Sequence, residues 1–328
     1  MGKDTLLQLG TKKSKRIHMK PLGGTELQHN FLEQHVSKDL LDKFQICTSV
    51  PGKVPLSKDK VNILWQKMAT DQPHFQKFFK DPEKIKQYDY YVFNSHWNYE
   101  QWRKTFDLPY EKCTVIKNGI TDIKQRDPKP QREKIKLIYH PTPWRGLSVL
   151  LGAMQLVKNP NIQLDVYSST QVYGDDFKRQ NDHLYQPLYD QAKTLSNVNY
   201  IGYKPNKYIL ENLHTYDAFV YPNVWEETSC ISAIEALACG LYMATTDNGA
   251  LYETCSEFPI YIPMDTNFEN LARQFAAVIE NIPNQINDEG CHTHLKFQQN
   301  FFNHFYNWKT IAGYWTNFLQ GALNVRST

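Results

Sequence analysis

Short apolar runs alternate with helix-periodic stretches along most of the chain. In the first third, the apolar runs have the length of buried strands, at residues 5–9, 44–48, 61–65, 90–93 and 114–116. A helical pattern begins near Thr25, where Leu27, Phe31, Leu32 and Val36 share one face. Strands that alternate with helices are typical of parallel α/β units.

A polar break interrupts this alternation at residues 121–134, which hold two prolines, eight charged residues and one apolar residue. This composition predicts a solvated linker. The alternation then resumes, with predicted strands at 135–139, 162–167, 198–201, 218–221, 241–245 and 260–262. Predicted helices begin near 147 and cover 184–195, 207–214, 229–239 and 268–279, before an aromatic helical tail at 295–319.

Two successive α/β sheets joined by one polar linker predict two Rossmann-like domains that face each other across a cleft. Ligands of open α/β sheets bind beyond the carboxyl ends of the strands. A cleft between two such edges suits a reaction with two substrates, one on each side, although architecture alone does not name the reaction.

Composition narrows the classes of protein. Of 328 residues, 41% are hydrophobic and 22% charged, and this composition excludes a disordered chain. The net charge of +3 is too small for a non-specific nucleic-acid-binding protein. No apolar run is long enough to span a bilayer, and residues 1–9 lack the features of a signal peptide. Six scattered cysteines without a CxxC pair indicate a reducing compartment, so we expect a cytoplasmic protein. The tract from Cys291 to His294 lacks the distant partners that a zinc site needs.

The chemically informative stretch is residues 221–240, where a strand, a polar loop and a helix follow one another. We expect the backbone amides of Thr228, Ser229 and Cys230 to form the helix N-terminus. Such a terminus binds anions and could receive a phosphate.

Two acids lie eight residues apart in the same stretch, Glu227 at the end of the loop and Glu235 inside the helix. Carboxylates here can accept hydrogen bonds from sugar and ribose hydroxyls. In a plainer interpretation, Glu227 is an acid stabilised by the dipole at the helix N-terminus and Glu235 is a solvated helix residue. The apolar neighbours Ile234 and Leu237 argue against that for Glu235, because a carboxylate among them needs partners.

The stretch resembles the E-x7-E signature of the retaining glycosyltransferases of family 4, also called glycosyl transferases group 1. The matching residues are Pro222, Glu227, Glu235, Ala236, Leu237, Ala238, Cys239 and Gly240. Where the family pattern has Glu-Gly-Phe-Gly, this chain has bulkier residues at 228–230 after Glu227.

Further segments resemble the family in chain order. Residues 21–26 match its glycine-rich turn, where Gly23 and Gly24 would approach the donor or acceptor, unless they form a simple turn. Residues 140–151 match the opening of its second domain. The resemblance implies that Arg145 there is the cation on the donor diphosphate and that Thr142 lines the same pocket, although Arg145 could be a surface charge.

Other matches have weaker implications. Tyr203 would form a wall beside the nucleotide base or be an ordinary core aromatic. Residues 93–95 and 118–119 resemble family turns and are interpreted as structural. One departure is Gln66, which stands where members of the family often have a histidine.

The resemblance implies an α/β fold of the GT-B type, in which a C-terminal helix crosses back to the first domain. The implied bounds are 1–124 for an acceptor-side domain, 125–303 for a nucleotide-sugar domain and 304–328 for the crossing helix. The implied activity is metal-independent, retaining transfer of a sugar from a nucleotide-diphosphate sugar to a glycan or other acceptor, with Glu227 and Arg145 as catalytic residues.

The implied partners are a nucleotide sugar and a glycan or glycoconjugate, with neither nucleic acid nor a cofactor, and peripheral membrane contact is left open. An alternative is a catalytically silent protein of the same fold that binds a nucleotide or glycan. A nicotinamide-dependent oxidoreductase is disfavoured because no GxGxxG motif follows any predicted strand.

Overall fold

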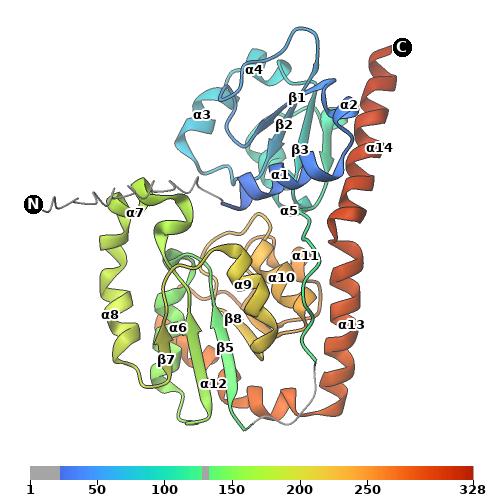
Figure 1. Cartoon of the computed structure of the whole chain (residues 1–328). Helices are drawn as coiled ribbons and strands as arrows, with labels where there is room; N and C mark the ends of the chain where they lie inside the picture. Colours follow the sequence, from blue (N-terminus) through green and yellow to red (C-terminus); the bar gives the residue numbers. More distant parts are fainter. Residues whose placement is uncertain (1–22, 128–132, 328) are drawn as a thin grey trace, which may run out of the picture.

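The computed structural model describes residues 23–127 and 133–327, which form two α/β domains stacked one above the other (Figure 1). Each domain has a parallel sheet, with strand order β1-β2-β3-β4 in the first and β10-β9-β8-β5-β6-β7 in the second. The predicted two-domain α/β fold is therefore confirmed. The predicted strand at 5–9 and Pro21 lie outside the described residues.

The first sheet is covered on both faces. Its strands are β1 (Phe44–Thr48), β2 (Val61–Gln66), β3 (Tyr90–Phe93) and β4 (Cys113–Val115). One face packs on α1 (Gly24–His35), α2 (Lys38–Leu41) and the last helix of the chain. The other packs on α3 (Pro73–Phe79), α4 (Pro82–Lys86) and α5 (His96–Thr105). Burial on both faces explains why Val61–Gln66 is an apolar run rather than an alternating one.

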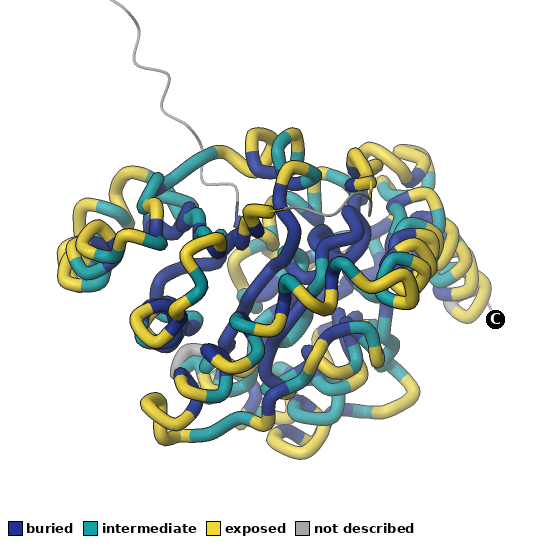
Figure 2. Tube along the Cα trace, turned by 90° about the horizontal axis from the view of Figure 1, so that it is seen from below, coloured by how far each residue is buried: buried dark blue, intermediate teal, exposed yellow. Residues whose placement is uncertain are grey.

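The second sheet lies in the larger domain, where the buried trace runs through the strands in the middle and the exposed trace through the outer turns of helices and the loops (Figure 2). Its strands are β5 (Ile135–Tyr139), β6 (Ile162–Val166), β7 (Val198–Tyr200), β8 (Ala218–Tyr221), β9 (Tyr242–Thr246) and β10 (Ile260–Ile262). Its α-helices are α6 (Leu147–Leu156), α7 (Asp175–Asn181), α8 (Gln186–Thr194), α9 (Asn206–Asn212), α10 (Ile231–Cys239), α11 (Leu251–Cys255) and α12 (Phe268–Ile286). Two 3-10 turns, η2 (Pro143–Arg145) and η3 (Thr170–Tyr173), border the site described below.

The domains are joined by two chain crossings that lie side by side. Ile120 donates its N–H to the Tyr306 carbonyl at 2.7 Å, and Trp308 returns a bond to the Ile120 carbonyl at 2.9 Å. The second crossing separates α13 (Glu289–Phe305) from α14 (Trp308–Ser327), which runs along the first domain (Figure 1). Trp308 and Trp315 of α14 are fully buried in the core of that domain, so the last helix completes the first domain.

Two local predictions were wrong. The helix after the 221–230 loop begins at Ile231 rather than at residue 229, because Cys230 has an extended backbone and forms the N-cap. The linker is also only partly solvated. Arg126 is 3% exposed and donates to the buried Asp217 carboxylate at 2.7 Å, so its charge is paired inside the second domain.

Candidate active site

A cleft of about 480 Å³ lies between the two domains, at the carboxyl ends of strands from both sheets. All but one of the predicted site residues line it, namely Gly23, Gly24, Thr142, Arg145, Tyr203, Glu227, Thr228, Ser229 and Cys230. Glu235 is the exception. Residues from distant parts of the sequence are thus gathered around one space, although the chemical role of each stays a prediction.

Arg145 reaches the cleft because of the glycine that follows it. Arg145 ends η2, and Gly146 then turns the chain into α6 with φ +118°, a conformation that side chains disfavour. A Cβ at Gly146 would lie 2.0 Å from the Pro222 carbonyl oxygen. The turn therefore fits only glycine, and it holds the guanidinium against the loop after β8.

Glu227 is held in place by its backbone and by two side chains. Its carboxylate forms an ion pair with Arg145 and accepts a hydrogen bond from the Tyr221 hydroxyl at 2.6 Å. Its carbonyl accepts from the N–H of Ala250 at 2.6 Å, and Gly249, with φ +67°, packs directly on its backbone. Burial favours the neutral guanidine of Arg145, but the Glu227 carboxylate, together with Tyr221 and Tyr173, holds the Arg145 pKa above its ordinary value.

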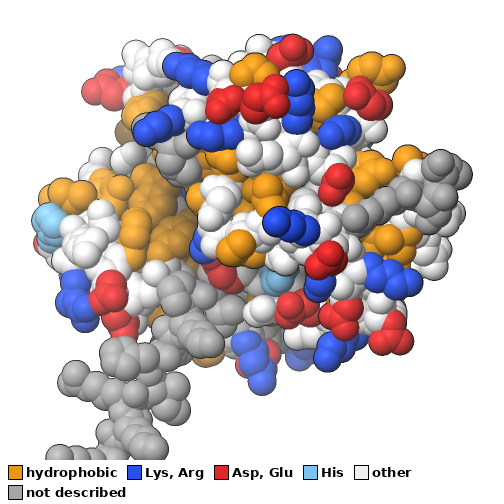
Figure 3. Space-filling view, turned by 90° about the horizontal axis from the view of Figure 1, so that it is seen from above, with side chains coloured by type: hydrophobic (Ala, Val, Ile, Leu, Met, Phe, Trp, Pro, Cys, Tyr) orange, Lys and Arg blue, Asp and Glu red, His pale blue; other side chains and the backbone are white. Residues whose placement is uncertain are grey.

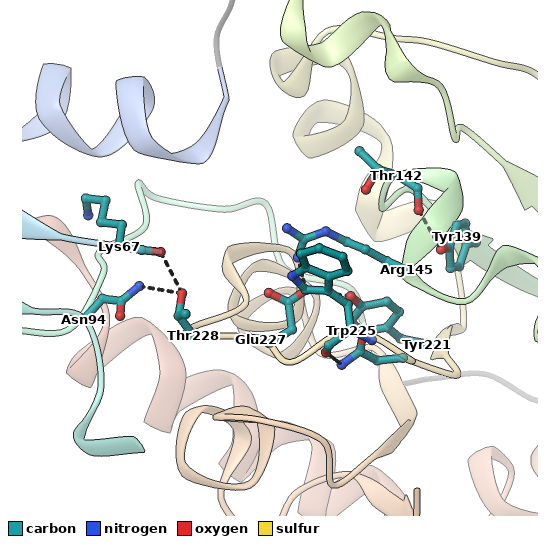
Figure 4. Close-up of polar contacts among 10 residues, drawn as sticks. Lys67, Asn94, Tyr139, Thr142, Arg145, Tyr221, Trp225, Glu227 and Thr228 are labelled. Atoms are coloured by element: carbon teal, nitrogen blue, oxygen red, sulfur yellow. Dashed lines mark hydrogen bonds and ion pairs between the residues drawn. The ribbon is translucent and has the colours of Figure 1, made fainter. Parts of the chain in front are cut away.

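Thr228 connects the two domains at the floor of the cleft (Figure 4). Its hydroxyl donates to the Lys67 carbonyl at 2.8 Å and accepts from the Asn94 side-chain amide at 3.1 Å. A glycine, the family residue at this position, could make neither bond. Thr228 therefore links the two domains, and Asn94 lines the cleft in addition to its place in a turn.

The start of α10 faces the cleft next to these residues. Because Cys230 is the N-cap, the amides without an acceptor inside the helix belong to Cys230 and to the first turn that follows it, rather than to Thr228 and Ser229. Ile231 and Ser232 of that turn line the cleft. Across the space, a Cβ at Gly24 would lie 3.1 Å from the Ile231 side chain, so glycine permits α1 to approach α10.

Glu235 lies behind the wall of the cleft, on the buried side of α10. It is 4% exposed, and the Asn206 side-chain amide donates to it at 3.5 Å. Burial raises the pKa of Glu235 to about 7. The predicted contact of Glu235 with ribose stays a prediction.

The structure adds cleft residues that sequence reasoning missed. Lys67 follows β2 directly, donates to Asn118 at 2.8 Å and lies 3.5 Å from the centre of the Trp65 ring. Its place immediately after an apolar strand was the available signal. Burial lowers its pKa, and no described carboxylate pairs with it. Gln66, beside it, bonds the Ser49 carbonyl and two backbone N–H groups, so it shapes the loop instead of facing the cleft.

Three buried polar atoms in the cleft wall have no hydrogen-bond partner among the described residues: Ser49 Oγ, His140 Nε2 and Thr142 Oγ1. Burial lowers the pKa of His140 to about 4, so its ring is neutral near pH 7. Unpaired buried polar groups are costly and are expected to meet a ligand or water. The cleft therefore has the polarity of a binding site.

The sequence profile of glycosyl transferases group 1 matches residues 120–288, which include Arg145, Glu227 and α10. The chain belongs to this family. No curated protein sequence matches it.

Members of the GT-B fold class are also its structural neighbours. A glycosyltransferase from Rickettsia africae ESF-5 superposes with a TM-score of 0.64 at 12% identity, covering 97% of this chain and 84% of that one. A sucrose-phosphate synthase from Thermosynechococcus elongatus gives 0.63 at 16% identity, over 92% and 79%. Anabaena Alr3699/HepE in complex with UDP-glucose gives 0.61 at 15% identity, over 80% and 72%. At these identities the likeness establishes the GT-B fold.

Two further findings concern membrane-spanning helices and metal ligands. Within residues 23–127 and 133–327, no helix combines the length and hydrophobicity needed to cross a membrane. In the same ranges, no three histidine, cysteine or acidic side chains are grouped as metal ligands. Within the tract from Cys291 to His294, Nε2 of the His292 ring forms a hydrogen bond with the Ile286 carbonyl at 2.7 Å.

Proposed function

We propose that the chain is a retaining, metal-independent transferase of family 4 that moves a sugar from a nucleoside-diphosphate sugar to a hydroxyl of a glycan or glycoconjugate in the cytoplasm. The observation that carries this proposal is the Arg145–Glu227 pair in the cleft, next to the first turn of α10. A cation and oriented amides stabilise the charge of a departing diphosphate, and a carboxylate beside them can bind sugar hydroxyls.

In the proposed reaction, the acceptor oxygen forms a bond to the anomeric carbon on the face from which the diphosphate leaves. The bond between that carbon and the diphosphate oxygen breaks, and its electron pair stays with the diphosphate. The hydroxyl proton passes to a diphosphate oxygen, so no protein nucleophile is needed. Arg145 and the first-turn amides of α10 would hold the diphosphate, while Glu227 would orient the sugar.

The ion pair sets a condition on donor binding. The Arg145 side chain is 24% exposed and that of Glu227 only 5%, so the carboxylate is the more enclosed partner. A diphosphate therefore approaches the guanidinium from its exposed side. An Arg fork has enough donors for a carboxylate and a phosphate together.

A panel of UDP-, GDP- and ADP-sugars tests the proposal, beginning with UDP-glucose because it is the ligand of the HepE complex. We expect thermal stabilisation by one class of nucleotide, slow donor hydrolysis that persists in EDTA, and an unchanged anomeric configuration in the NMR spectrum of the released sugar, recorded before the sugar mutarotates. The absence of binding and hydrolysis with every donor would contradict the proposal.

Arg145→Ala should weaken binding of the active nucleoside diphosphate by about tenfold or more, which is about 1.4 kcal/mol. Binding of the matching nucleoside, which lacks phosphates, should change little. The matched control is Arg179→Ala, an exposed arginine that pairs with Asp176 away from the cleft lining. Equal weakening for nucleoside and nucleoside diphosphate would assign Arg145 a structural role. Nucleotide binding that survives Glu227→Ala, with no turnover in either protein, would favour the silent alternative.

A further inference from the structure

A second hollow of about 530 Å³ opens from the cleft where Arg145 and Glu227 meet. Lys67 and Thr228 line both spaces, so a molecule in the hollow can reach the proposed reaction centre. Seen from above, hydrophobic side chains gather in a hollow beside the first domain, on the side of α7 (Figure 3). We call this space the aromatic pocket.

Its wall in the second domain is made of aromatic rings. Trp144, next to Arg145, stacks on Tyr173 with ring centres 5.9 Å apart and planes 18° apart. Tyr185 and Phe177 complete the cluster at 5.7 and 6.3 Å from Trp144. The rings come from η2, η3 and the α7 region, so the wall is built on packed segments.

Trp225 also lines the pocket and is 38% exposed, and the Arg145 guanidinium lies 6.0 Å from the centre of its ring. Its backbone is nevertheless fixed, because its N–H donates to the buried Asn223 side chain at 2.9 Å and its carbonyl accepts from the same side chain at 2.5 Å. Asn223 is anchored in turn by Thr246, which donates to its carbonyl at 2.7 Å. Trp225 lines the same space as the four rings of the second domain, and a contiguous apolar lining of this kind is typical of a binding site.

The rim of the pocket is polar and carries more acid than base. Exposed Asp71 and Glu226 lie on it, together with Gln72. Of the two cations that line it, Arg145 is already paired with Glu227. At the rim an anionic group would meet the carboxylates of Asp71 and Glu226, whereas hydroxyls would find acceptors. The second cation, Lys67, lies at the mouth shared with the cleft.

From these features we infer that the aromatic pocket binds a neutral sugar unit of the acceptor, with its ring against Trp225. The C–H face of a sugar is apolar and slightly positive and packs on the negative face of an aromatic ring, while the hydroxyls at its edge bond to carboxylates and amides. This inference rests on the proposed function and adds the class of acceptor. It places the acceptor hydroxyl at the mouth shared with the cleft, where the group transfer described above occurs.

Saturation-transfer NMR on the full chain tests the inference, with methyl glucoside, galactoside, mannoside and N-acetylglucosaminide, methyl glucuronide and an octyl glucoside as probes. We expect saturation of the ring protons of at least one neutral sugar and weaker saturation of the glucuronide.

Trp225→Ala should raise the dissociation constant of that neutral sugar about tenfold, and Trp225→Phe should restore much of the affinity. Tyr110→Ala, an aromatic that is 76% exposed in the first domain, is the matched control. Asp71→Asn provides a second variant that keeps every ring.

The inference is overturned if no neutral sugar is saturated, if Trp225→Ala binds as the unaltered chain does, if the glucuronide binds best, or if only the octyl chain of its glycoside receives saturation. The last result would identify a lipid-binding pocket. Donor hydrolysis without any acceptor is measured in parallel and reports on the proposed function alone. Hydrolysis with unchanged sugar binding in Trp225→Ala would therefore reject the acceptor pocket and leave the glycosyltransferase proposal standing.

Discussion

Glu235 has an unusual environment for an acid. It is buried among apolar neighbours on α10, where the Asn206 side-chain amide donates a long hydrogen bond to it. A carboxyl with a raised pKa is more stable in its neutral form, so ionisation of Glu235 opposes folding. If the side chain also bonds to a ribose, bound nucleotide should lower that pKa.

Glu235→Gln should reduce the pH dependence of stability. The pKa of Glu235 rises from an ordinary 4.5 to about 7 on folding. The folded chain therefore binds this proton more tightly than the unfolded chain, and the free energy of unfolding decreases as pH rises from 4.5 to 7. The loss approaches about 3 kcal/mol above pH 7. Urea unfolding at pH 4.5 and pH 8 measures it, with little difference between variant and unaltered chain at pH 4.5 and a more stable variant at pH 8.

Glu211→Gln is the control for this experiment, because Glu211 is exposed on the neighbouring helix α9. It should leave the pH profile unchanged. A Glu235→Gln profile that follows that of the unaltered chain would show that Glu235 ionises freely in the folded state.

Single residues also mark the limit of what the sequence could predict. The motif placed Arg145 and Glu227 beside one cleft, but their mutual ion pair depends on a tertiary contact between segments 82 residues apart. Lys67 was missed because a lysine after a strand is usually a solvated charge. Only the packing of Trp65 and Asn118 around it makes it a cleft residue.

At the scale of elements, hydrophobic patterning predicted most strands to within one residue, since the runs at 44–48, 90–93, 135–139, 218–221 and 260–262 are strands with those bounds. Patterning works here because strands buried on both faces must be short and apolar. Helix ends were less predictable. Helix α10 is capped at Cys230, two residues after Thr228 bonds to the first domain, and no local pattern encodes that tertiary contact.

The turn from η2 into α6 yields a second prediction. Gly146→Ala should destabilise the chain by several kcal/mol, because the new Cβ meets a backbone carbonyl and φ is positive. It should also displace Arg145, so that nucleoside-diphosphate affinity falls together with the melting temperature. Differential scanning calorimetry and nucleotide titration measure the two effects.

Gly313→Ala is the matched control, since Gly313 lies within α14 and a Cβ there would meet nothing within 4 Å. Alanine favours a helix by up to about 1 kcal/mol over glycine, so this variant should be slightly more stable. Equal melting temperatures for Gly146→Ala and the unaltered chain would mean that the turn can rearrange.

At the scale of the whole molecule, one acid joins the domains on the side away from the cleft residues. Glu253 of α11 accepts hydrogen bonds from the N–H groups of His96 and Trp97, both at 2.9 Å, and lies 3.3 Å from the Lys117 ammonium. Burial by itself would raise the pKa of Glu253, but these donors outweigh it and lower the pKa. The contact is therefore strong at neutral pH and weakens as pH falls below 4.5.

Glu253→Ala should let the domains separate more readily. We expect a larger radius of gyration in small-angle scattering at pH 7, a difference that narrows only as the pH falls well below 4.5, and a loss of about 1–3 kcal/mol in unfolding free energy. Glu257→Ala, which removes an exposed acid from the same region, should scatter as the unaltered chain does. Identical scattering by Glu253→Ala would show that the paired crossings and the contacts of Thr228 suffice to fix the domain arrangement.

The contribution of α14 to the first domain has a consequence for biosynthesis. Trp315 packs edge-on against Trp65 at 4.7 Å, yet a ribosome releases these two rings far apart in time, roughly twelve to fifty seconds at ~5–20 residues per second. Throughout that interval the nascent first domain carries an uncovered apolar face. Chaperones should therefore engage it during translation, and its folding should finish only after the last helix has left the exit tunnel.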